Sequence, residues 1–219
     1  MPLNERHVTP SILSADFSRL SSHVRELMDE GCRVIHCDVM DGHFVPPITF
    51  GPMVVGALRE SLPDEAYLDV HLMIERPEKH VEEFAKAGAD GITIHYESTP
   101  HIDYTLSAIR DAGCKAGLVV CPGTPPHPFA QSEIDLALIM TVNPGWGGQP
   151  FLRNQLEKIR RVRELLPDTA IEVDGGVNAE TGAECAEAGA TWFVAGSAIF
   201  KADDPVAAYH EIAKAVGAE

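Results

Sequence analysis

The feature that most constrains this chain is a repeated unit in which a short apolar run is followed by an amphipathic segment. The unit recurs eight times along 219 residues. The apolar runs are mostly continuous, which is typical of parallel strands that are buried on both faces. Strands are expected at 8–13, 33–38, 67–73, 91–95, 115–120, 136–142, 170–174 and 191–195. Helical segments are expected after Asp16, at 52–62, 77–88, 101–112, near 129, and at 154–166, 179–188 and 205–216.

This alternation has no interruption that would mark a boundary between domains. Ala-Gly recurs after the expected helices, at 87–88, 112–113 and 188–189, and no shift in composition marks a linker. Eight strand–helix units favour an α/β protein with a closed (β/α)8 TIM barrel, in a single domain spanning 1–219. An open doubly wound sheet of eight strands is the alternative.

Polar side chains end three of the expected strands. The second strand carries a histidine and an aspartate two residues apart, and alternate residues of a strand point to the same face. The third strand repeats an aspartate and a histidine, and the seventh ends in an aspartate before two glycines. The active site of a barrel lies at the carboxyl ends of its strands, where all these side chains are expected. The candidates for one convergent site are His36, Asp38, His71 and Asp174.

Two histidines and two aspartates predict a metal site. Imidazole and carboxylate groups suit Zn²⁺, Fe²⁺, Mn²⁺ or Co²⁺, so one divalent ion is the expected cofactor. Such an ion would act as a Lewis acid that polarises a carbonyl and stabilises an enediolate. Asp38 and Asp174 come from distant strands, so they can approach a planar enediolate from opposite faces. One carboxylate would remove a proton and the other would return it, which inverts a stereocentre without a redox cofactor.

Other side chains of the same strands surround these donors. Asp69 and Glu172 point inward below them, either as a buried polar layer or as groups that orient the ligands. His95 ends the fourth strand at the same mouth; we expect it to make a structural hydrogen bond, with membership of the site as the alternative. Three methionines are expected to form a dry, polarizable wall beside the substrate. They are Met40, Met73 and Met140.

Glycine-rich segments follow the last three strands. Glycine lets the backbone approach a ligand closely and leaves its N–H groups uncovered. The loops after strands seven and eight commonly hold phosphate in such barrels, helped by a helix N-terminus. Simple turn chemistry would explain one such pair, but three sets in adjacent loops predict a phosphate site. Its residues are expected to be Gly145, Trp146, Gly147, Gly148, Gly175, Gly176, Gly196 and Ser197.

The formal net charge of −16 limits the partners of this chain. It argues against nucleic acid and anionic membranes, and a phosphate must then be held by local backbone donors. Five cysteines without a CxxC pair fit a reducing compartment. Residues 1–7 lack the apolar segment of a signal peptide, and no apolar run is long enough to span a bilayer. We therefore expect a cytoplasmic protein, and a homo-oligomer because barrels of this kind usually associate.

Six segments, spread over nearly the whole chain, resemble in sequence and order the signatures of the ribulose-phosphate 3-epimerase family. They are 11–17 (SILSADF), 38–46 (DVMDGHFVP), 69–73 (DVHLM), 143–149 (NPGWGGQ), 173–178 (VDGGVN) and 195–200 (AGSAIF). The resemblance implies interconversion of D-ribulose 5-phosphate and D-xylulose 5-phosphate in the pentose phosphate pathway and the Calvin cycle. A phosphorylated pentulose is therefore the expected substrate.

The resemblance also implies roles for individual residues. Asp38 would accept the proton and Asp174 would donate it, with the roles reversed in the opposite direction. His36, Asp38, His71 and Asp174 would hold one divalent metal. Ser11 and His71 would contact the substrate, and the glycine segments named above would hold its phosphate.

Three positions depart from the pattern of this family. Trp146 stands where phenylalanine is usual, and Pro47 replaces a common asparagine. Cys121 begins a Cys-Pro-Gly segment in place of an Asn-Pro-Ala type. None of them is a proposed metal ligand, and Trp146 is expected to change how the loop closes and therefore the affinity for substrate.

Two other functions would use part of the same pattern. A 3-epimerase of another ketose phosphate, such as D-allulose 6-phosphate, would use the same carboxylates and metal. The second is a metal-free barrel, either an aldolase or decarboxylase-type enzyme or a phosphosugar-binding protein without chemistry. A Schiff-base aldolase needs a lysine at the carboxyl end of a strand, and none of the expected strands ends in one. A pure binding protein would not need two opposed carboxylates.

Overall fold

Eight parallel strands form the centre of the computed structural model, which describes residues 3–218. The strands are β1 (His7–Pro10), β2 (Val34–Met40), β3 (Tyr67–Met73), β4 (Gly91–His95), β5 (Lys115–Val120), β6 (Leu136–Met140), β7 (Ala170–Asp174) and β8 (Trp192–Ala195). The α-helices are α1 (Leu20–Asp29), α2 (Pro52–Ser61), α3 (Val81–Lys86), α4 (Ile102–Asp111), α5 (His127–Gln131), α6 (Gln155–Leu165), α7 (Ala179–Ala188), α8 (Ser197–Phe200) and α9 (Pro205–Val216). Short 3₁₀ turns are η1 (Ile12–Ser14), η2 (Phe17–Arg19), η3 (Pro77–Lys79) and η4 (Tyr96–Ser98). Within residues 3–218, no helix has the length and apolarity needed to cross a membrane.

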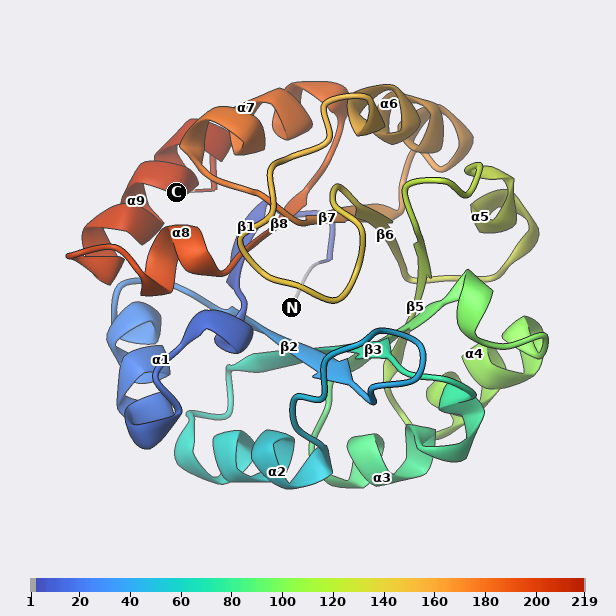
Figure 1. The fold of residues 1–219 in the computed structure, drawn as a ribbon, viewed down its shortest axis with the longest axis horizontal. Coiled ribbons are helices and arrows are strands. Elements are labelled where there is room, and N and C mark those ends of the chain that lie inside the picture. Colours follow the sequence, from blue (N-terminus) through green and yellow to red (C-terminus); the bar gives the residue numbers. More distant parts are fainter. Residues whose placement is uncertain (1–2, 219) are drawn as a thin grey trace.

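The sheet closes on itself as a barrel. From β2 to β8 each strand pairs in parallel with the next along the chain, and β1 pairs in parallel with β8. A parallel bridge between Ser11 and His36 joins the end of β1 to β2 on the remaining side. The helices surround the strands on the outside, as Figure 1 shows. This arrangement confirms the predicted (β/α)8 barrel; the predicted domain span of 1–219 reaches beyond the described residues at both ends.

Some element boundaries differ from the prediction because side chains cap the backbone. The first strand ends at Pro10 instead of 13, since the Ser11 side chain accepts a hydrogen bond from a backbone N–H and begins η1. Asp16 caps η2 in the same way, so the first α-helix starts only at Leu20. The helix expected at 77–88 divides into η3 and α3.

The barrel interior changes from apolar to polar along its axis. The end at which the strands begin holds a buried apolar cluster made of Val34, Leu136, Ala170 and Trp192. Farther along, several inward side chains are polar and fully buried, among them His36, Asp69 and Glu172. The larger apolar core lies between the sheet and the surrounding helices. The strand ends therefore carry their polar groups inside a rigid, fully packed scaffold.

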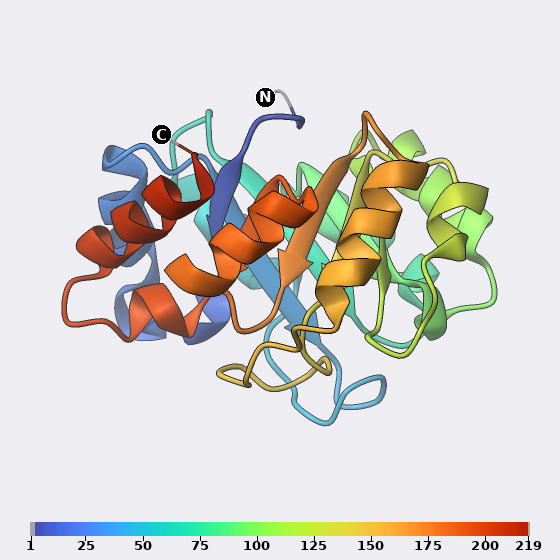
Figure 2. The same ribbon diagram turned by 90° about the horizontal axis from the view of Figure 1, so that it is seen from above.

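Two long loops stand over one end of the barrel. The loop 41–51 follows β2 and the loop 141–154 follows β6, and both project from the end opposite to the start of β1 (Figure 2). Within the first loop, Gly42 N donates to Pro47 O at 2.9 Å. Both loops therefore cover the carboxyl ends of the strands, where a barrel carries its active site.

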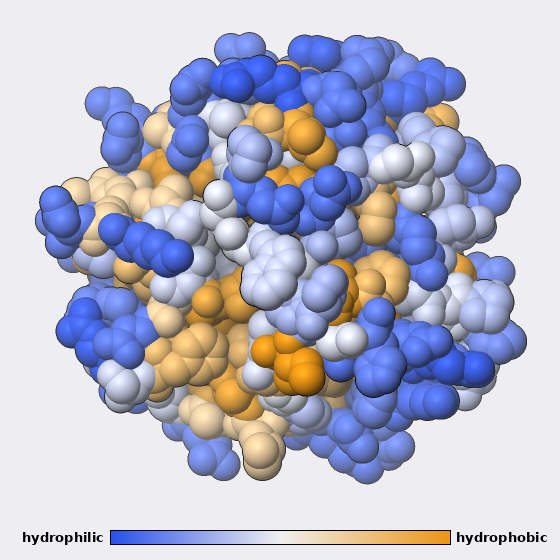
Figure 3. All heavy atoms as spheres, viewed as in Figure 1, coloured by the Kyte–Doolittle hydropathy of each residue, from blue (hydrophilic) through white to orange (hydrophobic). Residues whose placement is uncertain are grey.

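Apolar side chains gather on this loop-bearing face beside α1, α2 and the loop 41–51 (Figure 3). Exposed large side chains of this region include Phe17, Ile48 and Met53. Phe17 also packs against Phe50, with ring centroids 5.6 Å apart. The rest of the rim on this face is mostly hydrophilic.

Candidate metal centre and substrate pocket

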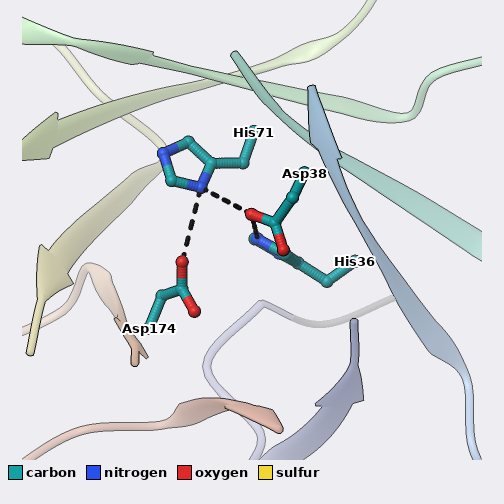
Figure 4. Close-up of side chains that lie close together, drawn as sticks. All are labelled: His36, Asp38, His71 and Asp174. Carbon is teal, nitrogen blue, oxygen red and sulfur yellow. Dashed lines mark hydrogen bonds and ion pairs between the residues drawn. The ribbon is translucent and has the colours of Figure 1, made fainter. Parts of the chain in front are cut away.

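Four donor side chains meet at the carboxyl ends of β2, β3 and β7 (Figure 4). Asp38 and His71 are direct partners in the register of β2 and β3, which brings their side chains together. Asp38 Oδ1 lies 3.2 Å from both His36 Nε2 and His71 Nδ1. Asp174 Oδ2 reaches from β7 to within 3.5 Å of the same His71 Nδ1. One ligand atom from each of the four residues lies within 4.8 Å of the others.

Buried carboxyl groups support His36 from below. His36 Nδ1 lies 2.6 Å from Asp69 Oδ2 and 3.4 Å from Glu172 Oε1, while its Nε2 faces Asp38. A carboxylate that accepts the Nδ1–H of a histidine leaves Nε2 with a lone pair for a metal. Thr9 Oγ1 donates to Glu172 Oε1 at 3.4 Å. The polar layer expected from Asp69 and Glu172 thus lies directly behind His36.

Glu172 is the group of this buried pair that holds a proton. Burial and the charge of Asp69 raise the pKa of Glu172 to about 8, so Glu172 is a neutral acid at neutral pH. Its O–H can donate to the neighbouring Asp69 carboxyl group.

The donor cluster concentrates negative charge that a cation would balance. Burial raises the pKa of Asp174, and the charge of Asp38 raises it further. Burial also acts on Asp38, but His36 and His71 outweigh it and hold the pKa of Asp38 well below its ordinary value. Burial lowers the pKa of His71, but its contacts with Asp174 and Asp38 raise that pKa to about 9. The two carboxylates thus favour positive charge at this point.

The residues fit a divalent transition metal. Two imidazole nitrogens and two carboxylate oxygens converge from three strands, a donor set that suits Zn²⁺, Fe²⁺, Mn²⁺ and Co²⁺. His36 would bind through Nε2 and His71 through Nδ1, because these atoms face the carboxylates. Ser11 Oγ donates to Asp38 Oδ2 at 2.5 Å, so Oδ1 is the oxygen of Asp38 that is turned toward the histidines.

A pocket opens above the donor cluster at the mouth of the barrel. Asp38 and Asp174 form part of its wall, whereas His36 and His71 are fully buried behind them and do not line it. The other predicted site residues in its lining are Ser11, Met40, Met73, Met140, Gly145, Trp146, Gly147, Gly148, Gly175, Gly176, Gly196 and Ser197. The structure thus brings every predicted site residue to one place, and contact of His71 with substrate stays a prediction.

Two glycines of this pocket occupy positions that a side chain would not fit. Gly175 (φ 120°) and Gly176 (φ 67°) have positive φ, which favours glycine. A Cβ on Gly175 would overlap the Val142 side chain, and one on Gly176 would lie 2.8 Å from Phe151 N. Thr141 Oγ1 donates to Gly175 O at 2.6 Å, which ties the loop after β6 to the loop after β7. Close backbone approach therefore shapes this side of the pocket.

The sequence interpretation did not single out several residues of the pocket. Gln149 Nε2 donates to Asn143 O at 2.6 Å and to Trp146 O at 2.8 Å, so it holds the glycine loop in its turn. Gln149 lies within the 143–149 segment, and a polar side chain that closes a glycine loop was the available signal. The remaining lining residues are Leu13, Ser14, Val142, Pro144, Val177 and Val194.

A second chain of polar groups lies behind His71. His71 Nε2 lies 2.9 Å from His95 Nε2, and His95 Nδ1 lies 3.4 Å from Glu97 Oε2 and 3.6 Å from Cys121 Sγ. Phe44 packs on the ring of His95 with centroids 4.7 Å apart, and His95 is fully buried. Burial lowers the pKa of His95 to about 4, so its ring is neutral at neutral pH. His95 therefore contacts the donor cluster from behind and not from the pocket.

The three positions that depart from the family pattern lie in different surroundings. Trp146 is 64% exposed on the loop 141–154. Pro47 lies in the other long loop, and its Cδ would be 3.5 Å from a Cβ placed on Gly145. Cys121 follows β5 beside His95. Trp146 and Pro47 thus belong to the region where the two long loops meet.

The sequence is similar to proteins of one family. A profile described as the ribulose-phosphate 3 epimerase family matches residues 7–200. The curated ribulose-phosphate 3-epimerase of Bacillus subtilis strain 168 is 48% identical over 216 residues, which cover 94% of this chain and 97% of that protein. The protein of the same name from Synechocystis sp. is 50% identical over 203 residues, covering 89% and 87%. The one from Escherichia coli K12 is 47% identical over 203 residues, covering 90% of each.

Solved structures with a similar fold are more distant in sequence. The crystal structure of KGPDC from Streptococcus mutans has a TM-score of 0.74 at 17% identity, covering 98% of this chain and 98% of that one. A 3-hexulose-6-phosphate synthase has a TM-score of 0.69 at 20% identity, covering 96% and 98%. At these identities the likeness shows the barrel fold alone.

Proposed function

This chain belongs to the ribulose-phosphate 3-epimerase family and is an isomerase, and on that premise we propose that it interconverts D-ribulose 5-phosphate and D-xylulose 5-phosphate. The reaction inverts the configuration at C3 of the sugar. The observation that carries the proposal is a pair of carboxylates, Asp38 and Asp174, that face one pocket from β2 and β7 beside a candidate metal cluster. The relatives of that name at about half identity support the same substrate.

The two aspartates perform the proton transfers. Asp38 removes the C3 proton of ribulose 5-phosphate, and the C–H electron pair becomes the C2–C3 double bond of an enediolate with its charge on O2. Asp174 then delivers a proton to the opposite face of C3, and the roles reverse in the other direction. Support comes from the surroundings of the two carboxyl groups, since His36 and His71 lower the pKa of Asp38 while burial and the charge of Asp38 raise that of Asp174. A base and an acid with separated pKa values suit such a transfer.

The chain's own residues orient and shield the reacting groups. His36, Asp38, His71 and Asp174 would hold one divalent ion, Zn²⁺, Fe²⁺, Mn²⁺ or Co²⁺. When bound, such an ion supplies Lewis-acid polarisation of the substrate carbonyl. Ser11 fixes the Asp38 carboxylate through its 2.5 Å hydrogen bond. The three buried methionines of the pocket wall exclude water from the enediolate.

Backbone N–H groups hold the phosphate of the substrate. The three glycine segments line one pocket, and several of their glycines have positive φ. In the described chain, no lysine or arginine lines this pocket. Successive N–H groups in such turns make anion-binding concavities. The phosphate affinity therefore comes from local donors, as the charge of −16 requires.

The same proposal assigns the enzyme to the pentose phosphate pathway or the Calvin cycle. It also includes a cytoplasmic location and assembly as a homo-oligomer. Support for a reducing compartment comes from the five cysteines, all of which are free.

The test is incubation of the metal-loaded protein with D-ribulose 5-phosphate in D₂O, followed by NMR of the C3 proton. We expect loss of the C3 signal together with formation of xylulose 5-phosphate, abolished by chelation and restored by metal. Activity that survives complete metal removal would eliminate the metal from the mechanism and leave the two aspartates in it. Absence of any exchange would reject this substrate, and D-allulose 6-phosphate would be tested next.

Single substitutions separate the roles of the two carboxylates. Asp174→Asn is expected to exchange the C3 hydrogen of ribulose 5-phosphate but to slow epimerisation by about 10²–10⁴-fold, because no acid serves the opposite face. Asp38→Asn is expected to behave in the same way toward xylulose 5-phosphate. The metal content of each variant is measured in parallel, since both residues are proposed ligands. Loss of exchange from both substrates in a variant that keeps its metal would contradict transfer from two sides.

A further inference from the structure

The rings of His71 and His95 meet nitrogen to nitrogen, with room for one hydrogen between them. Their Nε2 atoms are 2.9 Å apart and their ring planes are inclined by 26°. Both side chains are fully buried. A neutral imidazole carries a hydrogen on one nitrogen and a lone pair on the other. The hydrogen between the rings therefore belongs either to His71 or to His95.

This choice decides whether His71 can bind a metal. His71 presents Nδ1 to Asp38 and Asp174, at 3.2 Å and 3.5 Å. If His71 carries the shared hydrogen on Nε2, its Nδ1 can offer a lone pair to a metal. If His95 supplies that hydrogen, His71 Nε2 must accept it. His71 then carries its own hydrogen on Nδ1, which blocks the ligand atom.

Glu97 lies on the far side of His95 and biases the choice. Its Oε2 is 3.4 Å from His95 Nδ1, and because a carboxylate only accepts, it favours a hydrogen on that nitrogen. His95 Nε2 is then an acceptor, so His71 Nε2 donates to it. The Cys121 thiol, 3.6 Å from the same Nδ1, stays protonated because burial and Glu97 raise its pKa to about 12. A thiol is a weak hydrogen-bond donor, so the carboxylate sets the bias at this nitrogen.

We propose that Glu97 and His95 are positioning residues that set the tautomer of His71 and so prepare its Nδ1 for a divalent metal. The hydrogen bonds run from His71 to His95 and from His95 to Glu97. These bonds fix which nitrogen of His71 carries the hydrogen, just as the contact with Asp69 fixes it for His36. The inference rests on the proposed metal site, but the two residues lie outside its donor set.

The surroundings of Glu97 allow one substitution to reverse this chain of bonds. Its other oxygen, Oε1, accepts from Cys121 N at 2.9 Å and from the Thr124 hydroxyl. In Glu97→Gln the amide oxygen keeps these two donors, so the amide nitrogen must face His95 Nδ1. That nitrogen donates, which moves the hydrogen of His95 to Nε2 and drives His71 to the Nδ1–H form. An isosteric change thus inverts the tautomers.

His95, Glu97 and Cys121 also form a candidate metal cluster of their own. The proposed tautomers exclude an ion there while His71 binds one. His71 Nε2 then donates to His95 Nε2, and an ion on His95 Nδ1 would require a fully deprotonated ring. One metal ion per chain is therefore expected.

The test is the Zn²⁺ affinity of the full chain, measured by competition with a chromogenic chelator. Glu97→Gln is expected to weaken binding about 10–100-fold, the range known for partners of metal ligands. Glu97→Ala removes the bias without reversing it, so its loss is expected to be smaller. Thr124→Val removes a bond to the same carboxylate but keeps the oxygen that faces His95, so its affinity should stay near that of the wild type. A purely structural role for Glu97 would give the opposite order, with alanine worse than glutamine.

Nitrogen-15 NMR of histidine-labelled protein gives a second measurement. In the wild type the hydrogen of the His95 ring is expected on Nδ1, and in Glu97→Gln it should move to Nε2. Thermal unfolding of the metal-free proteins checks that each variant folds. Equal Zn²⁺ affinity in the wild type and Glu97→Gln would overturn the inference and leave the metal site. Failure of the wild type to bind Zn²⁺ would overturn both the inference and the proposed metal site. Binding of two ions per chain would overturn the inference but leave the metal site.

Discussion

At the scale of single residues, two histidines present different nitrogens to the same carboxylate. His36 turns Nε2 to Asp38, because Asp69 holds its Nδ1 at 2.6 Å. His71 turns Nδ1 to Asp38, because its Nε2 meets His95 at 2.9 Å. Each ligand atom is therefore fixed by a neighbour outside the donor cluster. Such partners orient the ring and tune the basicity of the ligand.

Alanine substitutions at two glycines of the phosphate region distinguish the cost of backbone strain from the cost of close packing. Gly176→Ala is expected to destabilise the protein by about 1–3 kcal/mol and to raise KM, because its Cβ would lie 2.8 Å from Phe151 N and 3.0 Å from Gln149 O. Gly148 also has positive φ, at 74°, but nothing lies within 4 Å of an added Cβ. Gly148→Ala therefore measures strain alone and should cost less. Urea unfolding and steady-state kinetics compare the two, and equal losses would contradict the role of close packing.

The donor set could be predicted from the sequence, but its hydrogen bonds could not. Alternate residues of a strand share a face, so His36 and Asp38 were paired by spacing alone. Glu97 acts on His71 only through a ring from the neighbouring strand, and no spacing along the chain encodes that contact. Gln149 was missed for a similar reason, because its bonds depend on the shape of the loop.

At the scale of elements, three alternate strands begin with the same type of contact. A backbone N–H near the start of β3, β5 and β7 donates to a side chain that stands just before the next strand. The pairs are Leu68 N with Asp90 Oδ2 at 2.8 Å, Ala116 N with Asp135 Oδ2 at 2.9 Å, and Ile171 N with Thr191 Oγ1 at 3.0 Å. These bonds fix the register of three strand pairs at the end of the barrel away from the site.

Removing one of these acceptors should destabilise the barrel without touching the pocket. Asp135→Ala is expected to cost about 1–3 kcal/mol, because Ala116 is fully buried and its N–H would lose its acceptor. Glu133→Ala is the matched control, since its side chain is 89% exposed and 3.9 Å from Arg110, and it should change stability by less than about 0.5 kcal/mol. Urea unfolding gives both values. Two variants of equal stability would show that the contact does not hold the register.

Helix ends could be predicted better than helix starts. The glycines expected to end helices all have positive φ, which a side chain disfavours. They are Gly88, Gly113 and Gly189. The start of α1 was predicted too early, because Asp16 accepts a hydrogen bond from Ser18 N and begins a 3₁₀ turn instead. A side-chain cap of this kind can begin either an α-helix or a 3₁₀ turn, so composition does not show which of the two will follow.

At the scale of the whole molecule, a strongly negative protein is proposed to bind a negatively charged substrate. The formal net charge is −16, and in the described part of the chain no lysine or arginine lines the pocket. The summed field therefore repels a phosphate at long range, while the N–H donors act only at short range. Added salt should then raise the rate at which the substrate meets the enzyme. Salt lowers that rate for an enzyme whose positive charge attracts its substrate.

Salt is expected to increase the efficiency of this enzyme at low ionic strength. Between low salt and about 0.15 M, kcat/KM for the pentulose phosphate should rise by about twofold, because the Debye length falls to about 8 Å and screens the repulsion. Steady-state rates in sodium chloride and in a choline salt measure the effect, and agreement between the salts excludes a specific cation. A steep fall of kcat/KM with salt would instead reveal a positive steering region.

The two tryptophans of the chain lie in opposite environments. Trp146 is 64% exposed on the loop over the pocket, whereas Trp192 is fully buried and donates Nε1–H to Leu3 O at 2.9 Å. The molecule thus contains two intrinsic fluorophores, one open to a collisional quencher such as acrylamide and one protected from it. Quenching of the Trp146 emission reports how exposed the loop over the pocket is. The emission of the protected Trp192 serves as an internal reference. Occupancy of the pocket can therefore be followed optically in the unlabelled protein.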